Sequence, residues 1–279
     1  MLDIDTLRTW EGRTETIKDH LDLSVLAKIG SFFGKSNDAT RGAPIDETWH
    51  WCFFHPSVSA AELSTDGHTR TGGFLPPFDL PRRMWGGSRL SFHAPLKAGE
   101  AAVKTSRVMS VKLKTGKSGM LGLVTVEHLI QQGDTLCRRE EQDIIYRESA
   151  RGTKGPVTAL ECPEGAEYST SFTADPVTLF RYSALTYNAH RIHYDREYAT
   201  GEEGYRALVV HGPLTASLLA QFSRSTRSDA PMRAFSFRGT SPLFDSEPFT
   251  LHSRSGPVAD KLWVAQQKGG MAMTAEAAF

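Results

Sequence analysis

The chain has 279 residues, and its 32 basic and 32 acidic side chains leave no net charge. This balance gives no electrostatic reason to expect nucleic acid or an anionic membrane surface as a partner. No apolar run approaches the ~20 residues of a membrane-spanning helix, and the acidic N-terminus differs from a basic leader peptide. We expect a cytoplasmic protein, with the mitochondrial matrix left open, that is long enough for one large or two modest folded units.

The N-terminal half begins with a weak helical pattern within residues 1–25. Its residues are Leu2, Thr6, Leu7 and Trp10. The segment Gly30–Ser36 superficially resembles a phosphate-binding loop, but three residues separate its glycines where four are required. We expect a turn that ends a helix there. The aromatic run Trp49–Pro56 is typical of a core, and the proline-rich segment Thr71–Pro81 is incompatible with a helix.

Three strand-like runs follow, at residues 107–113, 120–131 and 135–147. No amphipathic helix is evident in this half. The next segment, Glu148–Pro156, is rich in turn formers and indicates a linker. We therefore expect two domains, residues 1–150 and residues 157–279.

One short pattern occurs on both sides of this linker. The segment Leu90–Glu100 resembles Ala234–Glu247, because each holds an apolar strand, a Pro-Leu turn and the start of a second strand. The matching prolines, Pro95 and Pro242, are separated by about half the chain. A repeat at this spacing predicts a duplicated structural unit.

The C-terminal half has a clearer helical pattern. After Pro213, which suits the first turn of a helix, apolar residues recur at helical spacing. They are Leu214, Leu218, Leu219 and Phe222. Four strand-like runs follow, at residues 233–238, 249–253, 262–267 and 271–277. We expect a curved antiparallel sheet that wraps around this helix.

The segment Tyr182–Asp195 has the densest chemistry of the chain. The eight residues from Asn188 to Asp195 include four with reactive side chains. These are the amide of Asn188, the imidazoles of His190 and His193, and the carboxylate of Asp195. A His-Gly-Pro turn, His211–Pro213, then opens the predicted helix. Its first N–H groups lack helical partners and can hold a developing negative charge. A proton-handling group beside such a helix end suits chemistry at a thioester carbonyl.

This neighbourhood resembles the MaoC-like (R)-specific enoyl-CoA hydratases, whose signature is roughly [ST]-G-D-x-N-P-I-H-x-D. The chain keeps the signature residues at four positions, Thr186, Ile192, His193 and Asp195. It differs at four others, with Tyr187 for Gly, Asn188 for Asp, His190 for Asn and Arg191 for Pro. The variant is similar to the subgroup of mesaconyl-C4-CoA hydratases and mitochondrial-type 3-hydroxyacyl-thioester dehydratases. The match is specific over some forty residues.

The resemblance implies an α+β double hot-dog fold. Each unit would be a curved antiparallel sheet, and only the C-terminal unit, residues 157–279, would keep its central helix and catalytic motif. The unit at residues 1–150 would be degenerate. The aromatic run Trp49–Pro56 would then cover an acyl pocket, and the substrate would enter between the two units.

The resemblance also implies reversible hydration of an α,β-unsaturated acyl thioester, or dehydration of its 3-hydroxyacyl product. His193 would be the base, because an imidazole can take and return a proton near neutral pH. Asn188 would orient the water, since an amide cannot accept a proton. The Gly212 N–H would hold the oxyanion, with His211 as a positioning residue. Asp195 would be structural or a partner for a histidine.

Substrate recognition is less defined by the sequence. Tyr187 is a candidate substrate contact, and Arg191 and Arg181 are the nearest cations. An arginine there would suit a dicarboxylic acyl group such as mesaconyl, although a solvated arginine or a coenzyme A phosphate contact is an equal alternative. The acyl carrier would be coenzyme A or acyl carrier protein. We expect no metal or redox cofactor, and a homodimer is an open expectation.

Several alternatives remain at this stage. A metal site at His190, His193, Asp195 and His211 is disfavoured, because no H-E-x-x-H pattern or cysteine cluster accompanies it. The three cysteines, Cys52, Cys137 and Cys162, have no C-x-x-C spacing and indicate reduced thiols. A dehydratase of fatty acid metabolism, an acyl-CoA thioesterase and a non-catalytic acyl-thioester-binding module are the competing functions.

Overall fold

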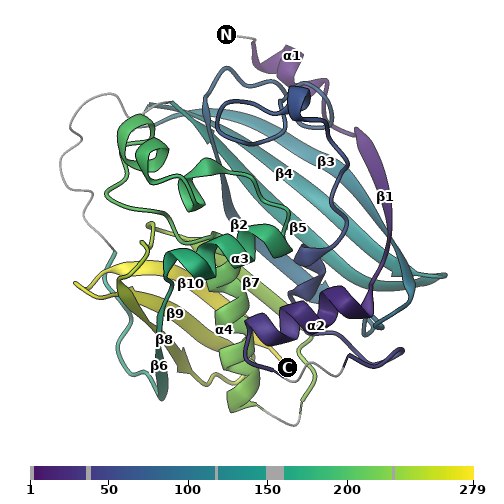
Figure 1. Ribbon diagram of the computed structural model, residues 1–279, viewed down its shortest axis with the longest axis vertical. Helices are drawn as coiled ribbons and strands as arrows, with labels where there is room; N and C mark the ends of the chain where they lie inside the picture. The colour runs from purple at the N-terminus through teal and green to yellow at the C-terminus, as the bar shows by residue number, and fades with distance from the viewer. Residues whose placement is uncertain (1–2, 36–38, 117–118, 149–159, 228–229) are drawn as a thin grey trace.

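The computed structural model describes residues 3–35, 39–116, 119–148, 160–227 and 230–279. Its core is one antiparallel ten-stranded sheet, with β1 at one edge and β6 at the other (Figure 1). In spatial order the strands are β1 Thr14–His20, β3 Ala101–Gly116, β4 Gly119–Gln132, β5 Thr135–Arg147, β2 Arg82–Phe92, β7 Ala234–Gly239, β10 Met271–Ala278, β9 Asp260–Gln266, β8 Pro248–Arg254 and β6 Tyr168–Thr173.

The two halves of this sheet repeat the same connectivity. Strands β1 to β5 form one half, β6 to β10 form the other, and corresponding strands take mirrored places in the order. The two central strands, β2 and β7, pair antiparallel, with Leu90 opposite Phe235. The two similar sequence segments, Leu90–Glu100 and Ala234–Glu247, begin within these two strands. The predicted α+β double hot-dog arrangement is confirmed.

The C-terminal half wraps around helix α4, Gly212–Thr226. The helix contacts β7, β8, β9 and β10, and two of its predicted apolar residues, Leu214 and Leu219, are fully buried. Leu218 and Phe222 are partly buried against the same core. The predicted helix and its apolar face are therefore confirmed, and all seven strand-like runs of the two halves are strands.

The N-terminal half contains a helix just before the expected helix-ending turn, although the pattern of the helix itself was too weak to indicate it. Helix α2, Leu23–Phe32, is capped by Asp22 and packs against α3, Pro176–Leu185. Leu26 and Ile29 are buried in one cluster with Ala102 and Ile130 of the sheet. The sequence pattern did not indicate this helix, because only two of its ten residues, Leu26 and Ile29, are buried apolar side chains at helical spacing.

Other N-terminal expectations are met in part. Helix α1 spans only Ile4–Arg8, and β1 follows it directly. Helix α2 ends just before Gly34, whose positive φ of 69° makes the expected helix-ending turn. Segment 71–81 contains no helix. Residues 149–156 of the expected linker lie outside the described residues, so the domain boundary stays a prediction.

The inner face of the N-terminal half carries a buried polar group between two apolar clusters. Strand register places Arg83 opposite Tyr146, and Leu90 opposite Glu140, on one face of the sheet. The Glu140 carboxylate is buried and accepts hydrogen bonds from His50, Trp51 and Ser88. This face is covered by irregular chain, with short turns η1 Trp49–Cys52 and η2 Ala60–Glu62. None of the described helices is long and apolar enough to cross a membrane.

Candidate active site

The signature segment follows helix α3 and is shaped by backbone constraints. After the helix, Tyr187 adopts a left-handed conformation with φ of 49°, and the Asn188 N–H donates to the Ser183 carbonyl at 2.9 Å. A single helical turn, η3 Arg191–His193, then directs Ile192 and His193 into the core. The sharp reversal at Tyr187 brings the motif back over the start of α4.

His193 is buried and has a defined tautomer. Its Nδ1 lies 2.7 Å from the carbonyl oxygen of Val209, which can only accept, so Nδ1 carries the proton. The Nε2 atom is then an acceptor in the neutral ring. Burial lowers the pKa of His193 to about 4, although the Val209 hydrogen bond opposes this shift. His193 is therefore an uncharged base at neutral pH.

Four imidazoles form a row, which we call the histidine row: His68, His190, His193 and His211. Ring centroids are 4.0 Å apart between His68 and His190, and 5.5 Å apart between His190 and His193. His193 and His211 are stacked at 3.6 Å. Burial is the largest cause that lowers the pKa of all four rings. The row joins the N-terminal half to the N-cap residue of α4.

The start of α4 closes one end of the row. His211 is its N-cap but makes no side-chain capping bond, because its Nε2 is 2.9 Å from the Ser183 hydroxyl. Its Nδ1 has no partner within the described part of the chain. The first N–H groups of the helix are thus left for another acceptor. A Cβ added to Gly212 would meet no atom within 4 Å, so there is open space beside this residue.

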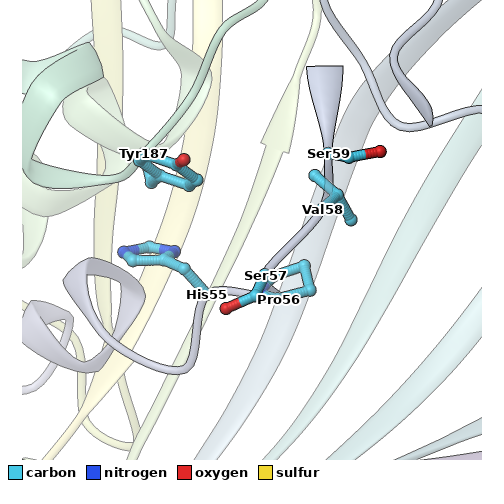
Figure 2. Close-up of a pocket in the computed structure, with 6 residues that line it drawn as sticks. All are labelled: His55, Pro56, Ser57, Val58, Ser59 and Tyr187. Carbon is cyan, nitrogen blue, oxygen red and sulfur yellow. The ribbon is translucent and has the colours of Figure 1, made fainter. Parts of the chain in front are cut away.

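Asn188 and Tyr187 lie at the edge of the row. The Asn188 side-chain oxygen accepts from the His190 N–H at 2.9 Å, which leaves its NH2 group to face a ligand. Tyr187 is 67% exposed and lines a surface cavity of about 510 Å³. Figure 2 shows its ring next to the His55 ring on one side of this cavity, with Val58 and Ser59 on the other side. The end of the aromatic run therefore borders a cavity beside the motif.

Arg191 has a different environment from the one expected. Its guanidinium donates to Asp195 at 2.7 and 3.0 Å and to the Thr65 carbonyl at 3.1 Å, and it lies 4.1 Å from the Tyr198 ring. These contacts occupy the guanidinium N–H groups with which Arg191 would pair with a substrate carboxylate. Arg191 thus attaches the motif to the N-terminal half, and its role as a substrate contact stays a prediction. Arg181 lies over the Phe32 ring, on an exposed face of α3.

A loop of the N-terminal half, residues 63–70, covers the motif. The Asp66 carbonyl accepts from the Arg191 N–H at 2.9 Å. Gly67 has a φ of 92°, and a Cβ there would lie 1.8 Å from the Ala189 carbonyl oxygen. Neither this loop nor His68 could be predicted from the sequence, because a single Asp-Gly-His turn matches no part of the signature. Only the fold brings them to the site.

The loop carries a carboxylate–imidazole pair, Asp66 and His68. Their side chains are 2.7 Å apart, and Asp66 also accepts from the Ser64 hydroxyl and the His68 N–H. Burial opposes ionisation of Asp66, but the hydrogen bond and charge of His68 outweigh it and lower the pKa of the carboxyl. Ligand atoms of Asp66, His68 and His190 lie within 4.8 Å of one another. Because the carboxylate already accepts three hydrogen bonds, the arrangement favours an acid–base pair over a metal centre.

Comparisons with known proteins agree with this geometry. The chain is 45% identical over 255 residues to mesaconyl-C(4)-CoA hydratase of Chloroflexus aurantiacus, a match that covers 91% of this chain and 90% of that protein. Among solved structures, a MaoC-like dehydratase from Phytophthora capsici has a TM-score of 0.70 at 14% identity, covering 100% of this chain and 99% of that one.

A Mycobacterium tuberculosis protein described as a double hot-dog fold has a TM-score of 0.58 at 14% identity, with 99% of this chain and 97% of that chain covered. These structural matches show the fold. The sequence pattern of hydroxyacyl-thioester dehydratase type 2 matches residues 48–245, which include loop 63–70 and the whole signature segment. The chain belongs to the hydroxyacyl-thioester dehydratase type 2 family.

Proposed function

We propose that the protein is a hydro-lyase that adds water reversibly across the C2–C3 double bond of an α,β-unsaturated acyl-CoA. The reverse reaction dehydrates the 3-hydroxyacyl-CoA. One observation carries the proposal: a neutral His193 with a free Nε2 lies beside the uncapped start of α4. The thioester itself makes the β-carbon electrophilic, so the proposal requires no metal or redox cofactor.

The two groups divide the chemistry between them. His193 Nε2 takes a proton from water as the water oxygen bonds to the β-carbon. The π electrons move to the thioester oxygen, where the Gly212 N–H and the dipole of α4 stabilise the enolate. The proton held by His193 then passes to the α-carbon, and the thioester carbonyl reforms. One water molecule is consumed, and the histidine returns to its neutral form.

Asn188 takes a supporting role in this proposal. Its oxygen is engaged by the His190 N–H, so its NH2 group would orient the attacking water or a substrate oxygen. His211 would hold His193 by stacking at 3.6 Å. Tyr187, on the cavity rim, would contact the substrate as it enters.

The proposed substrate is a short branched dicarboxylyl-CoA. The supporting observation is the 45% identity to a mesaconyl-C(4)-CoA hydratase across nine-tenths of both chains. The alternative is a 3-hydroxyacyl group of fatty acid metabolism on coenzyme A or acyl carrier protein, which the family description favours. A thioesterase is the competing reaction, since an oxyanion site also suits thioester hydrolysis.

The proposal is tested by incubating the protein with mesaconyl-C4-CoA and with crotonyl-CoA. Enoyl absorbance and free thiol are followed in the same sample. We expect absorbance to fall without release of thiol, and to fall faster with mesaconyl-C4-CoA. Thiol that appears in step with substrate loss would establish a thioesterase instead.

A further inference from the structure

We infer that Arg83, from the N-terminal half, binds the carboxylate of a dicarboxylic acyl group. The inference rests on the proposed function and names the residue that selects the acyl chain. It assigns a substrate contact to the unit that lacks the signature segment. Arg83 would bind the acyl end of the substrate, while His193 and Gly212 act on the thioester end.

The position of Arg83 is set by strand register. It lies near the start of β2, directly opposite Tyr146 of β5, on the inner face of the sheet. Tyr146 is buried there, whereas Arg83 is half-buried. The chain that covers this face includes loop 63–70, whose Thr69 carbonyl lies 3.5 Å from the Arg83 guanidinium. Arg83 therefore lies next to the loop that carries His68.

The charge of Arg83 is not balanced by a protein carboxylate. Its neighbour Arg82 pairs with Glu203 at 2.8 Å, and Arg191 pairs with Asp195. Arg83 forms no ion pair with any carboxylate in the described ranges, and its one backbone hydrogen bond is long. A half-buried cation without a counter-charge is costly, and a carboxylate with two oxygens would match its fork.

The same charge is directed at the histidine row. After burial, the charge of Arg83 is the largest cause that lowers the pKa of His68, and it contributes to the low pKa of His190. Asp66 is the carboxylate of this neighbourhood, but Ser64 and His68 already hold it. At the end of the row remote from Gly212, the Asp66 carboxylate is thus held by Ser64 and His68, and the Arg83 cation has no carboxylate partner within the described residues.

The polarity of the site matches that of a dicarboxylyl thioester. The oxyanion donor at Gly212 and the base His193 lie at one end of the row, and the Arg83 charge acts on the rings of His68 and His190 towards the other end. A dicarboxylyl-CoA presents a thioester oxygen, an alkene and a carboxylate in the same order. A linear fatty acyl chain would bring only apolar carbon to Arg83 and leave its charge unmatched.

The test compares Arg83→Gln with the parent on mesaconyl-C4-CoA and crotonyl-CoA. We expect kcat/KM for mesaconyl-C4-CoA to fall by about 10–100-fold, the range for one lost charge-assisted interaction, while crotonyl-CoA changes by less than about threefold. Arg83→Lys, which keeps the charge but loses the fork, should fall between them. Crotonyl-CoA turnover also reports that the variant is folded. Equal losses on the two substrates, or no loss, would overturn the assignment.

A matched control is Arg89→Gln on the same strand. Arg89 is exposed and pairs with Glu141 and Asp143, so its removal should leave the ratio of the two substrates unchanged. If Arg89→Gln also changes the ratio of activity on mesaconyl-C4-CoA to activity on crotonyl-CoA, then removing any positive charge from this strand affects the substrates differently. That result would remove the argument for Arg83.

A binding measurement separates this inference from the reaction itself. Succinyl-CoA and butyryl-CoA have no double bond to hydrate, and they differ by the terminal carboxylate. By calorimetry, the parent should prefer succinyl-CoA, and Arg83→Gln should lose that preference. If the parent turns over neither enoyl-CoA, the proposed hydration fails, yet this preference still decides the role of Arg83. An unchanged preference in Arg83→Gln would refute it.

Discussion

At the scale of single residues, the environment of His193 explains how an imidazole can be a base without a carboxylate partner. The Val209 carbonyl fixes the proton on Nδ1, and burial keeps the ring neutral. In the related signature an Asp precedes the histidine by five residues, whereas this chain has Asn188. The site therefore depends on one base, which stays in its active form well below neutral pH.

Replacement of His193 tests this dependence. We expect His193→Ala to lower the hydration rate by about 100-fold or more, because proton transfer from water loses its acceptor. The variant should remain folded by circular dichroism. His20→Ala, an exposed residue of β1, is the control and should keep full activity. Activity of His193→Ala within a few-fold of the parent would show that another group is the base.

The pH dependence follows from the same pKa. Protonated His193 cannot accept a proton, so activity should fall only as the pH approaches about 4, the pKa of the buried ring, and not near 6.5. The measurement is kcat/KM for crotonyl-CoA between pH 4 and pH 8, after each sample is shown to be stable at that pH. An acid limb centred near 6.5 would indicate a solvent-exposed base.

At the scale of structural elements, loop 63–70 completes the site from the other half of the chain. The Gly67 backbone lies so close to Ala189 that no side chain fits between them. The Arg191–Thr65 and Arg191–Asp66 contacts attach the loop to the motif. Loop and motif thus form one unit, and the position of His68 depends on that contact.

Gly67→Ala should separate the loop from the motif. The added Cβ would overlap the Ala189 carbonyl oxygen, and a φ of 92° is strained for alanine. We expect kcat to fall at least about tenfold, with a loss of stability of about 1–3 kcal/mol. Gly133→Ala shares the positive φ but has open space around it, and it should keep its activity. Equal activity of the two variants would mean that loop docking is unimportant.

The sequence predicted elements well where one periodic pattern was long. Helix α4 and seven of the strands were found because each repeats its pattern over several residues, whereas β1 fell in the segment 1–25, for which the sequence indicated a helix. Helix α2 and strand β6 were missed, since α2 has few anchors and β6 is an exposed edge strand with only Phe172 partly buried. For the candidate site, the sequence proposed only the contiguous motif and the helix start. His68 is remote in sequence, and only loop docking brings it beside the motif.

At the scale of the whole molecule, the two halves share a topology but have different cores. One half packs apolar side chains around α4, and the other buries a polar network beneath irregular chain. In that network Arg138 donates to His50 Nδ1, so His50 Nε2 donates to Glu140. A duplicated unit has thus kept its sheet and changed its covering layer. The predicted homodimer remains untested.

The network makes a prediction about stability. Burial opposes the Glu140 charge, but the hydrogen bond and charge of His50 outweigh it and lower the pKa of Glu140 to about 2. A lowered carboxyl pKa stabilises the fold above the unfolded value of 4.5, and the contribution is lost as the pH falls towards 2.

We expect Glu140→Ala to cost about 3–5 kcal/mol in the free energy of unfolding at pH 7, because His50, Trp51 and Ser88 lose their shared buried acceptor and the buried Arg138 charge loses a nearby carboxylate. The measurement is urea unfolding at pH 7. Glu276→Ala, on an exposed position of β10, is the control and should stay within about 0.5 kcal/mol of the parent. A loss of similar size at both positions would contradict a structural role for the network.

The most direct test of the account is the fate of the water oxygen. The reaction is run on mesaconyl-C4-CoA in water enriched in oxygen-18, and the products are analysed by mass spectrometry. We predict one heavy oxygen in a hydroxyl group on the β-carbon, with the acyl group still attached to coenzyme A. Heavy oxygen in a newly released carboxylate, together with free coenzyme A, would contradict hydration and establish thioester hydrolysis.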